Sequence, residues 1–299
     1  MRLFALPLIG RAGLGNNLFP WARAELFARQ SGAKMLAPQW TRIRLGPYLR
    51  REPQKRRYGR EFQMEHHVRG LSRLLISMLG RRIPEAQALT YLHMSQSLLP
   101  SVVEFSGIDD LFTPLLTEHE FIRRQLWSIT SEPLRSTGEQ YGGRFIAMHV
   151  RRGDLTRQGF TQQELAGVYQ FTPLIWFVDM ARAVRGFEPL RSVPIVVFTD
   201  GENEEVEALR CIDGVFFSQR QRPITDLWTM AHAGLLFASG FSTFSMWASY
   251  LGGMPTIYAP GKIQQRVQTG RAQAMEIELA GGQNIPANAL ARFSTDLAL

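Results

Sequence analysis

The stretch that most constrains this chain is an apolar run that ends in two arginines. Residues 145–155 read FIAMHVRRGDL, and their apolar start is too short for a helix. Such a run is typical of a buried strand in a parallel sheet. Open α/β sheets bind ligands at the carboxyl ends of their strands, where the two arginines stand. The stretch therefore predicts an α/β fold with a basic ligand site at this strand end.

Strand alternation separates the two arginines. Successive side chains of a strand point to opposite faces, so Arg151 shares a face with His149 and Arg152 takes the other. We expect Arg151 to meet an anionic ligand, because a guanidinium stays charged and its fork of donors fits phosphate. We expect Arg152 to pair with a nearby acid. The alternative is a structural ion pair between an arginine and an aspartate that only closes the strand end.

The rest of the second half repeats a strand–helix rhythm. Apolar runs at 194–198, 235–239 and 255–258 alternate with helical patterns, which predicts a parallel sheet with right-handed crossovers. At 299 residues, 45% of them hydrophobic, the chain is long enough for two domains. A polar, glycine-rich stretch before the arginine strand serves as the linker. We therefore expect domains at 1–140 and 141–299.

The first half opens with a strand, a glycine turn and a helix. Leu3 to Ile9 is the predicted strand and 17–29 the predicted helix. This geometry points backbone N–H groups at an anion, and asparagine amides suit sugar hydroxyls or a pyrophosphate. The candidate ligand-binding residues of the turn are Gly13, Gly15, Asn16 and Asn17. An NAD-binding turn stays open as an alternative, although Leu18 occupies the third glycine position of that fingerprint.

The basic residues are concentrated in one segment. The formal charge of the chain is +8, and residues 42–82 alone hold twelve Lys or Arg and three acids. Within this insertion, placed at about 40–82, apolar residues recur at helical spacing: Val68, Leu71, Leu74, Leu75, Met78 and Leu79. A basic amphipathic helix suits an anionic membrane surface. The alternative is a core-facing helix with a solvated basic face. Nucleic acid is not expected as a partner, because no aromatic-rich binding motif accompanies the charge.

Other features bound the class of protein. Leu98 to Leu116 shows no period and is expected to be irregular, followed by a helix over 117–129 with Thr117 as its N-cap. Cys211 is the single cysteine, and no apolar run is long enough to span a bilayer. We expect a cytoplasmic location, peripheral on the inner face of the plasma membrane. No Asp-x-Asp, H-E-x-x-H or P-loop pattern occurs, so no metal and no cofactor are expected.

Three separated stretches resemble one family. The run from Gly13 to Phe19 (GLGNNLF) is similar to the G-x-L-G-N-Q-L-F segment of bacterial α-1,2-fucosyltransferases, with Asn17 in place of Gln. His149 to Asp154 matches the H-x-R-R-G-D motif shared with α-1,6- and protein O-fucosyltransferases. Asp226-Leu227 and the later STFSMW run, with Met246 in place of the first Trp, resemble the family's D-L-x-x-M and S-S-F-S-W-W segments. Order and spacing agree over nearly the whole chain.

The resemblance implies an architecture and a reaction. The architecture is GT-B-like, with two Rossmann-like domains facing a cleft and the N-terminal domain on the acceptor side. The reaction is an inverting, metal-independent transfer of L-fucose from GDP-fucose to a hydroxyl of an oligosaccharide or lipid-linked glycan. The implied linkage is α-1,2, in surface polysaccharide or O-antigen synthesis. The alternative functions are a non-catalytic nucleotide- or glycan-binding module and an NAD-binding Rossmann protein.

The resemblance also implies roles for single residues. Arg151 would bind the β-phosphate, with His149 near the nucleotide. Asp226 would accept hydrogen bonds from guanine N1–H and N2–H. The alternative for Asp226 is a purely structural role as the N-cap of a helix. From a helix start, Ser242, Thr243 and Phe244 would cap the phosphates and ribose; simple helix capping is the alternative for the two hydroxyls.

The reaction also needs a base for the acceptor hydroxyl. The candidates are Glu164, ranked first, and Asp154, which we expect to be held by an arginine.

Overall fold

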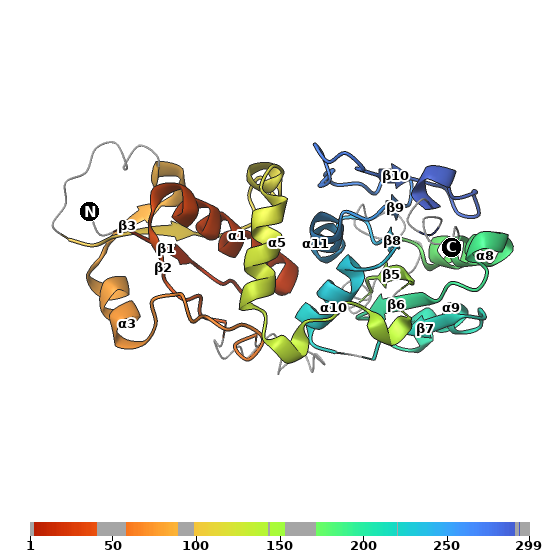
Figure 1. Cartoon of the computed structure of the whole chain (residues 1–299), viewed down its shortest axis with the longest axis horizontal. Coiled ribbons are helices and arrows are strands. Elements are labelled where there is room, and N and C mark those ends of the chain that lie inside the picture. Colours follow the sequence, from red (N-terminus) through yellow and green to blue (C-terminus); the bar gives the residue numbers. More distant parts are fainter. Residues whose placement is uncertain are drawn as a thin grey trace, which may run out of the picture. The chain divides into compact units, whose positions relative to one another are not determined.

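The computed structural model describes residues 3–40, 58–88, 99–142, 144–152, 172–219, 221–290 and 293. The chain divides into two compact units, Met1–Leu134 and Arg135–Leu299 (Figure 1). Each unit has its own sheet and its own hydrophobic core. The boundary between the units falls inside the polar stretch expected to act as the linker.

The first unit is built on four parallel strands in the order β2-β1-β4-β3. In chain order these are β1 (Leu3–Pro7), β2 (Lys34–Met35), β3 (Arg81–Pro84) and β4 (Ser101–Phe105). Its helices are α1 (Leu14–Ser31), α3 (Gly70–Leu79) and α5 (His119–Ile129), with short 3-10 helices at Glu85–Gln87, Thr113–Leu115 and Glu132–Leu134.

Alternation along these strands assigns α1 and α3 to opposite faces of the sheet. Phe4, Leu6 and Val102 share a small core with Ile76 of α3. Phe105, whose side chain points the other way from Val102, meets Phe27 of α1 at 5.5 Å between ring centroids.

The prediction that 98–116 is irregular was wrong, because β4 lies within it. β3 begins at the end of the basic insertion and was not predicted. Both pair in parallel register, and β4 is almost wholly buried, so it lacks the alternating pattern that marks a half-exposed strand. The helix predicted after Thr117 begins at His119, and its N-cap position is occupied by Glu118.

The second unit is built on six parallel strands in the order β10-β9-β8-β5-β6-β7. They are β5 (Ile146–Val150), β6 (Ile195–Thr199), β7 (Val215–Phe217), β8 (Leu235–Ala238), β9 (Thr256–Tyr258) and β10 (Glu276–Glu278). Its helices are α8 (Leu174–Gly186), α9 (Glu207–Arg210), α10 (Pro223–Ala231) and α11 (Thr243–Gly252). Further 3-10 helices lie at Glu139–Tyr141, Glu188–Leu190, Glu204–Val206 and Ala287–Leu290.

β5 occupies the interior of this sheet, between β8 and β6. One face is covered by α8 and α9 and the other by α10 and α11 (Figure 1). Met148 and Val150 belong to the core that includes Trp176 and Phe177 of α8. The buried parallel strand and the parallel sheet predicted from the sequence are confirmed.

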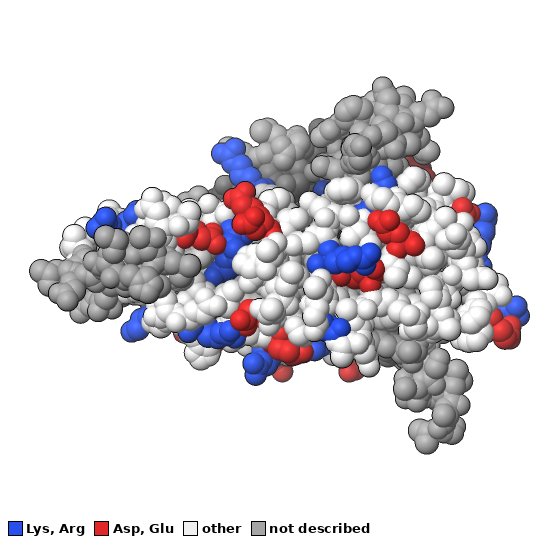
Figure 2. All heavy atoms as spheres, turned by 90° about the horizontal axis from the view of Figure 1, so that it is seen from above, with Lys and Arg blue, Asp and Glu red and all other residues white. Residues whose placement is uncertain are grey.

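Within the described part of the chain, no helix is long and apolar enough to cross a membrane. On the face shown in Figure 2, basic and acidic side chains of the described residues are interspersed.

Candidate functional site at the carboxyl end of strand β5

The two arginines leave β5 in opposite directions. Arg151 is half-exposed, with 38% of its side chain accessible, whereas Arg152 is only 2% exposed. The guanidinium of Arg152 lies 5.9 Å from the ring centre of Phe177 on α8. His149 lies two residues before Arg151, so both side chains point to the same face of β5. This face is covered by α11, where the His149 ring lies 5.4 Å from the ring of Phe244. The division between a ligand-side arginine and a core-side arginine follows from strand alternation.

The backbone of Arg151 is fixed by the neighbouring strand. Its N–H donates to Ser239 Oγ at 2.9 Å, and that hydroxyl donates to the carbonyl of His149 at 2.8 Å. The Arg151 side chain reaches toward the end of β6, where Nη1 lies 3.5 Å from Oδ2 of Asp200. The guanidinium is therefore positioned at the strand end while it remains accessible to solvent.

Arg152 supports the same strand end from the core side. Its Nη1 donates to the carbonyls of Arg151 at 3.0 Å and Thr172 at 2.9 Å, and its N–H donates to Asp200 Oδ1 at 2.7 Å. Burial lowers the pKa of Arg152 to about 10, although the charges of Glu205 and Asp200 oppose this shift. Arg152 thus stays charged at neutral pH.

Gly201 follows Asp200 and lets Arg152 approach closely. A side chain at this glycine would place its Cβ 2.8 Å from Cβ of Arg152. The tight turn after β6 therefore depends on the absence of a side chain there.

His149 is a neutral hydrogen-bonding group. Its Nδ1 lies 2.6 Å from Ser245 Oγ, inside α11. Burial, with a smaller contribution from the charge of Arg151, lowers the pKa of His149 to about 3. The imidazole is therefore uncharged at physiological pH, and it orients the strand end against α11 rather than adding positive charge.

A strained turn leads from β8 into α11. Phe241 has a φ of 52°, a left-handed conformation that a bulky side chain rarely adopts. Ser242 follows as the N-cap of α11, and its side chain accepts a hydrogen bond from the N–H of Ser245 at 3.4 Å. Ser242 is buried, whereas Thr243 and Phe244 are partly exposed. The hydroxyl of Ser242 therefore caps the helix, and the first turn of α11 remains partly accessible.

Asp226 lies near the carboxyl end of β7, the edge strand of the sheet. It belongs to the first turn of α10, which begins at Pro223 with Arg222 as N-cap, so Asp226 is not the N-cap itself. Its Oδ1 accepts a hydrogen bond from Ser218 Oγ at 2.9 Å. Burial raises the pKa of Asp226 to about 7, and the bond from Ser218 only partly offsets this. Asp226 is only partly buried, so its carboxyl can still accept hydrogen bonds from a ligand.

The glycine turn of the first unit is organised by Asn17. Gly13 is the N-cap of α1, and Gly15 and Asn16 lie in its first turn. Asn17 is 2% exposed; its Oδ1 accepts from Gly10 N–H at 2.8 Å and its Nδ2 donates to the carbonyl of Ala12 at 2.9 Å. The amide of Asn17 thus holds the turn in shape.

The two candidate bases, Asp154 and Glu164, lie outside the described residues. Among the described residues, no group of three or more His, Cys, Asp or Glu side chains is arranged to hold a metal ion.

Several residues of the site were not predicted from the sequence. They are Thr172, Asp200, Ser218, Ser239 and Ser245, each of which contacts a predicted residue. A usable signal existed for Asp200, since it directly follows a predicted strand and so belongs to the ligand-binding edge of the sheet. Ser245 belongs to the STFSMW run, although no role was assigned to it there. The remaining three are single hydroxyl residues with no distinguishing pattern.

Comparison with known proteins identifies the fold. No family model and no curated protein sequence matches this chain. Among solved structures, fucosyltransferase NodZ from Bradyrhizobium aligns with a TM-score of 0.51 and 16% identity, over 83% of this chain and 92% of that chain.

POFUT1 in complex with GDP-fucose aligns with a TM-score of 0.52 and 11% identity, over 93% and 98% of the two chains. POFUT1 in complex with GDP gives 0.51 and 12%, over 86% and 98%. The α/β, GT-B-like fold expected from the sequence is confirmed: the chain has the fold of these fucosyltransferases.

Proposed function

We propose that this chain transfers L-fucose from GDP-fucose to a glycan hydroxyl with inversion at the anomeric carbon. The observation that carries the proposal is the accessible guanidinium of Arg151 at the carboxyl end of β5, on the face that α11 covers. The fold is shared with proteins whose structures contain GDP or GDP-fucose. An α-1,2 linkage and a role in surface polysaccharide synthesis belong to the proposal on the strength of the sequence motifs alone.

The diphosphate would lie between Arg151 and the start of α11. A helix N-terminus presents N–H groups and a partial positive charge to an anion, and Thr243 adds a partly exposed hydroxyl there. Charge develops on the leaving diphosphate as the bond to fucose breaks. A preorganised guanidinium stabilises that charge more strongly than it stabilises the ground state.

The guanine would lie toward Asp226. The order β5-β6-β7 separates Arg151 from the β7 edge by two strand spacings, on the order of 10 Å. This is the scale of an extended nucleoside diphosphate. A single carboxylate can accept hydrogen bonds from both guanine N1–H and N2–H, and binding would then relieve the poor solvation that raises the pKa of Asp226.

The acceptor side needs a base for the attacking hydroxyl. Glu164 and Asp154 remain the proposed bases, in that order. An oligosaccharide or lipid-linked glycan is the proposed acceptor. The glycine turn with Gly13, Gly15, Asn16 and Asn17 is proposed as a further donor-binding segment.

A panel of GDP-sugars with defined glycan acceptors, read by mass spectrometry, tests the proposal. We expect mass gain of one deoxyhexose with GDP-fucose. If GDP-mannose gives the only product, the proposed donor is wrong.

Ligand-induced stabilisation separates the transferase from an NAD-binding protein. We expect GDP to raise the melting temperature, because a ligand that binds only the folded state stabilises it by mass action. NAD should leave the melting temperature unchanged. Stabilisation by NAD and not by GDP would contradict the proposed site, whereas GDP binding without turnover would favour the non-catalytic binding module.

Removal of divalent metal is expected to leave GDP affinity unchanged, because the proposed site neutralises the diphosphate with Arg151 and a helix N-terminus. Titration calorimetry in excess chelator, compared with titration in excess magnesium, checks this. A loss of affinity of more than about tenfold in chelator, or about 1.4 kcal/mol, would show that a metal takes part.

A further inference from the structure

The most unusual surface of the described molecule is helix α3 in the first unit. Its apolar stripe repeats at i, i+3, i+4, i+7 and i+8, the pattern by which a helix normally packs on a core. The stripe nevertheless faces solvent: Leu71 is 77% exposed, Leu74 49%, Leu75 54%, Met78 71% and Leu79 65%. No residue of this helix is fully buried.

The side of α3 that does face the sheet is the more polar one. Arg73, Ile76 and Ser77 share the helical face opposite the stripe and are partly buried, and Ile76 alone joins the small core. Arg73 Nε donates to the carbonyl of Ala37 at 2.7 Å, and Ser77 Oγ accepts from Arg82 at 3.0 Å. Polar contacts therefore hold the helix on the sheet while its apolar stripe faces outward.

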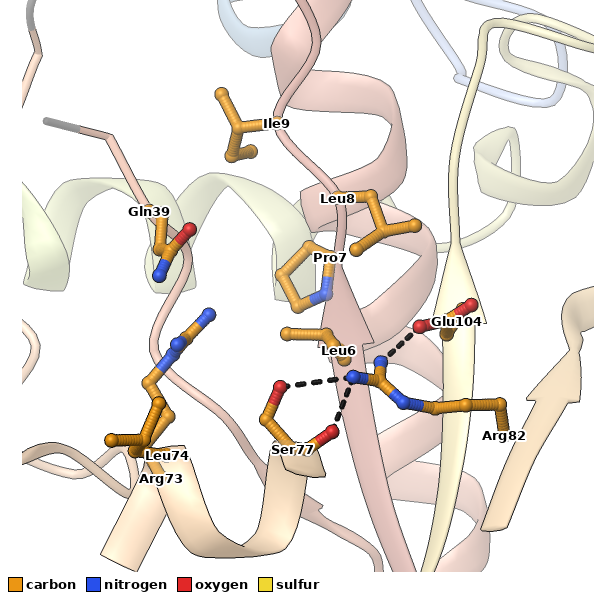
Figure 3. A pocket seen from close by; sticks show the side chains of 10 residues that line it. All are labelled: Leu6, Pro7, Leu8, Ile9, Gln39, Arg73, Leu74, Ser77, Arg82 and Glu104. Atoms are coloured by element: carbon orange, nitrogen blue, oxygen red, sulfur yellow. Dashed lines mark hydrogen bonds and ion pairs between the residues drawn. The ribbon is translucent and has the colours of Figure 1, made fainter. Parts of the chain in front are cut away.

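The cavity beneath α3 does not account for the outward direction of the stripe, because it is smaller than a typical ligand site. A cavity of about 220 Å³ lies between α3 and the end of β1 (Figure 3). Its charged groups are already engaged, since Arg82 pairs with Glu104 and also bonds Ser77. Small-molecule sites are typically larger, at roughly 300–1,000 Å³. Within the described part of the chain, the outward stripe, rather than this cavity, is the apolar surface that faces solvent.

We infer that the α3 stripe docks on an anionic lipid surface. Arg69 and Arg81 are exposed at the two ends of the helix, and residues 66–84 contain no acid. The exposed charge near the stripe is therefore complementary to acidic headgroups, whereas Arg73 and Arg82 are engaged with the sheet. The stripe itself consists of Leu and Met, and Leu is typical of the apolar face of helices that lie in a membrane interface.

Vesicle flotation with matched variants tests this inference independently of the proposed fucosyl transfer. The full chain is expected to float with vesicles of phosphatidylcholine and phosphatidylglycerol at low salt, and to bind pure phosphatidylcholine at least about tenfold less. The double variant Leu71→Ser/Leu75→Ser should lose at least about tenfold in partitioning. The control Ile175→Ser, which alters a 60% exposed side chain of α8, should leave it unchanged.

Charge is tested in the same way. Arg69→Gln should weaken binding and reduce its salt dependence, whereas Arg182→Gln, at an exposed position of α8, should not. Failure to float at low salt, or equal partitioning of wild type and the double variant, would overturn the inference. If wild type sediments as a dimer and the double variant as a monomer, the stripe binds a second copy of the chain and not lipid. GDP-dependent stabilisation of the same samples reports separately on the nucleotide site.

Discussion

Replacing Arg151 by alanine is expected to lower turnover by roughly 10²–10³-fold, because one preorganised donor to the developing charge is lost. The protein should still fold, since the Arg151 side chain is 38% accessible and its backbone is held by Ser239. Arg151→Lys should recover little, because an ammonium keeps the charge and loses the fork of donors. Steady-state kcat with GDP-fucose and the best acceptor checks both variants.

Arg152 supplies the matched comparison one residue along the strand. Arg152→Ala removes a buried cation that bonds two carbonyls beside Asp200 and Glu205, so its main effect should be on stability. A hydrogen bond from a charged group contributes about 1.5–3 kcal/mol, so loss of these two bonds predicts a fall in melting temperature of roughly 6–24 °C. Near-normal turnover in Arg151→Ala would refute the site assignment. It would also be refuted if Arg151→Ala mainly lost stability and Arg152→Ala mainly lost turnover.

The affinity for GDP is expected to depend on pH through Asp226. Guanine binds the carboxylate form, and the free carboxyl has a pKa of about 7. Affinity should therefore be highest above pH 7 and fall by up to about tenfold for each pH unit below it. In Asp226→Asn this component should disappear. The terminal phosphate of GDP also titrates, so the informative quantity is the difference between the two titration profiles.

The same substitution is expected to weaken GDP binding by roughly 5–150-fold above pH 7, since a carboxylate–guanine pair contributes about 1–3 kcal/mol. Although this substitution weakens binding, it should stabilise the folded protein above pH 7. The pKa of Asp226 is raised by folding, so ionisation destabilises the folded state as pH rises from 4 toward 7 and above. Asp226→Asn should thus melt higher than wild type at pH 8 and nearly equally at pH 4.

The control for Asp226 is Glu204→Gln, the same carboxylate-to-amide change at an exposed position of the second unit. It should alter neither GDP affinity nor its pH profile. If Asp226→Asn retains full affinity with an unchanged profile, the guanine lies elsewhere.

The sequence was sufficient where a local pattern maps directly onto geometry. A short apolar run followed by arginines defined β5, and the period of two along a strand separated Arg151 from Arg152. The strand–helix rhythm of the second half predicted the parallel sheet. These inferences succeeded because side-chain direction in a strand depends on the backbone alone.

Other strands escaped detection because their environment is not local. β3 and β4 are recognised only by pairing with each other and with β1 across the sheet. The contacts of Asp200, Ser239 and Ser245 with the arginine strand likewise join residues 48 to 96 positions apart. Asn17 looked like a ligand-binding amide, yet the fold directs its amide into the turn backbone.

Helix α3 shows most clearly what the sequence determined and what the tertiary structure determined. The sequence by itself determined that residues 70–79 form an amphipathic helix among arginines, because that follows from spacing and charge. Only the tertiary structure decided which side faces the sheet, and it placed Arg73, Ile76 and Ser77 inward. Periodicity defines two opposite faces of a helix. The choice between them depends on which groups of the sheet, here the carbonyl of Ala37 and the side chain of Arg82, are available as partners.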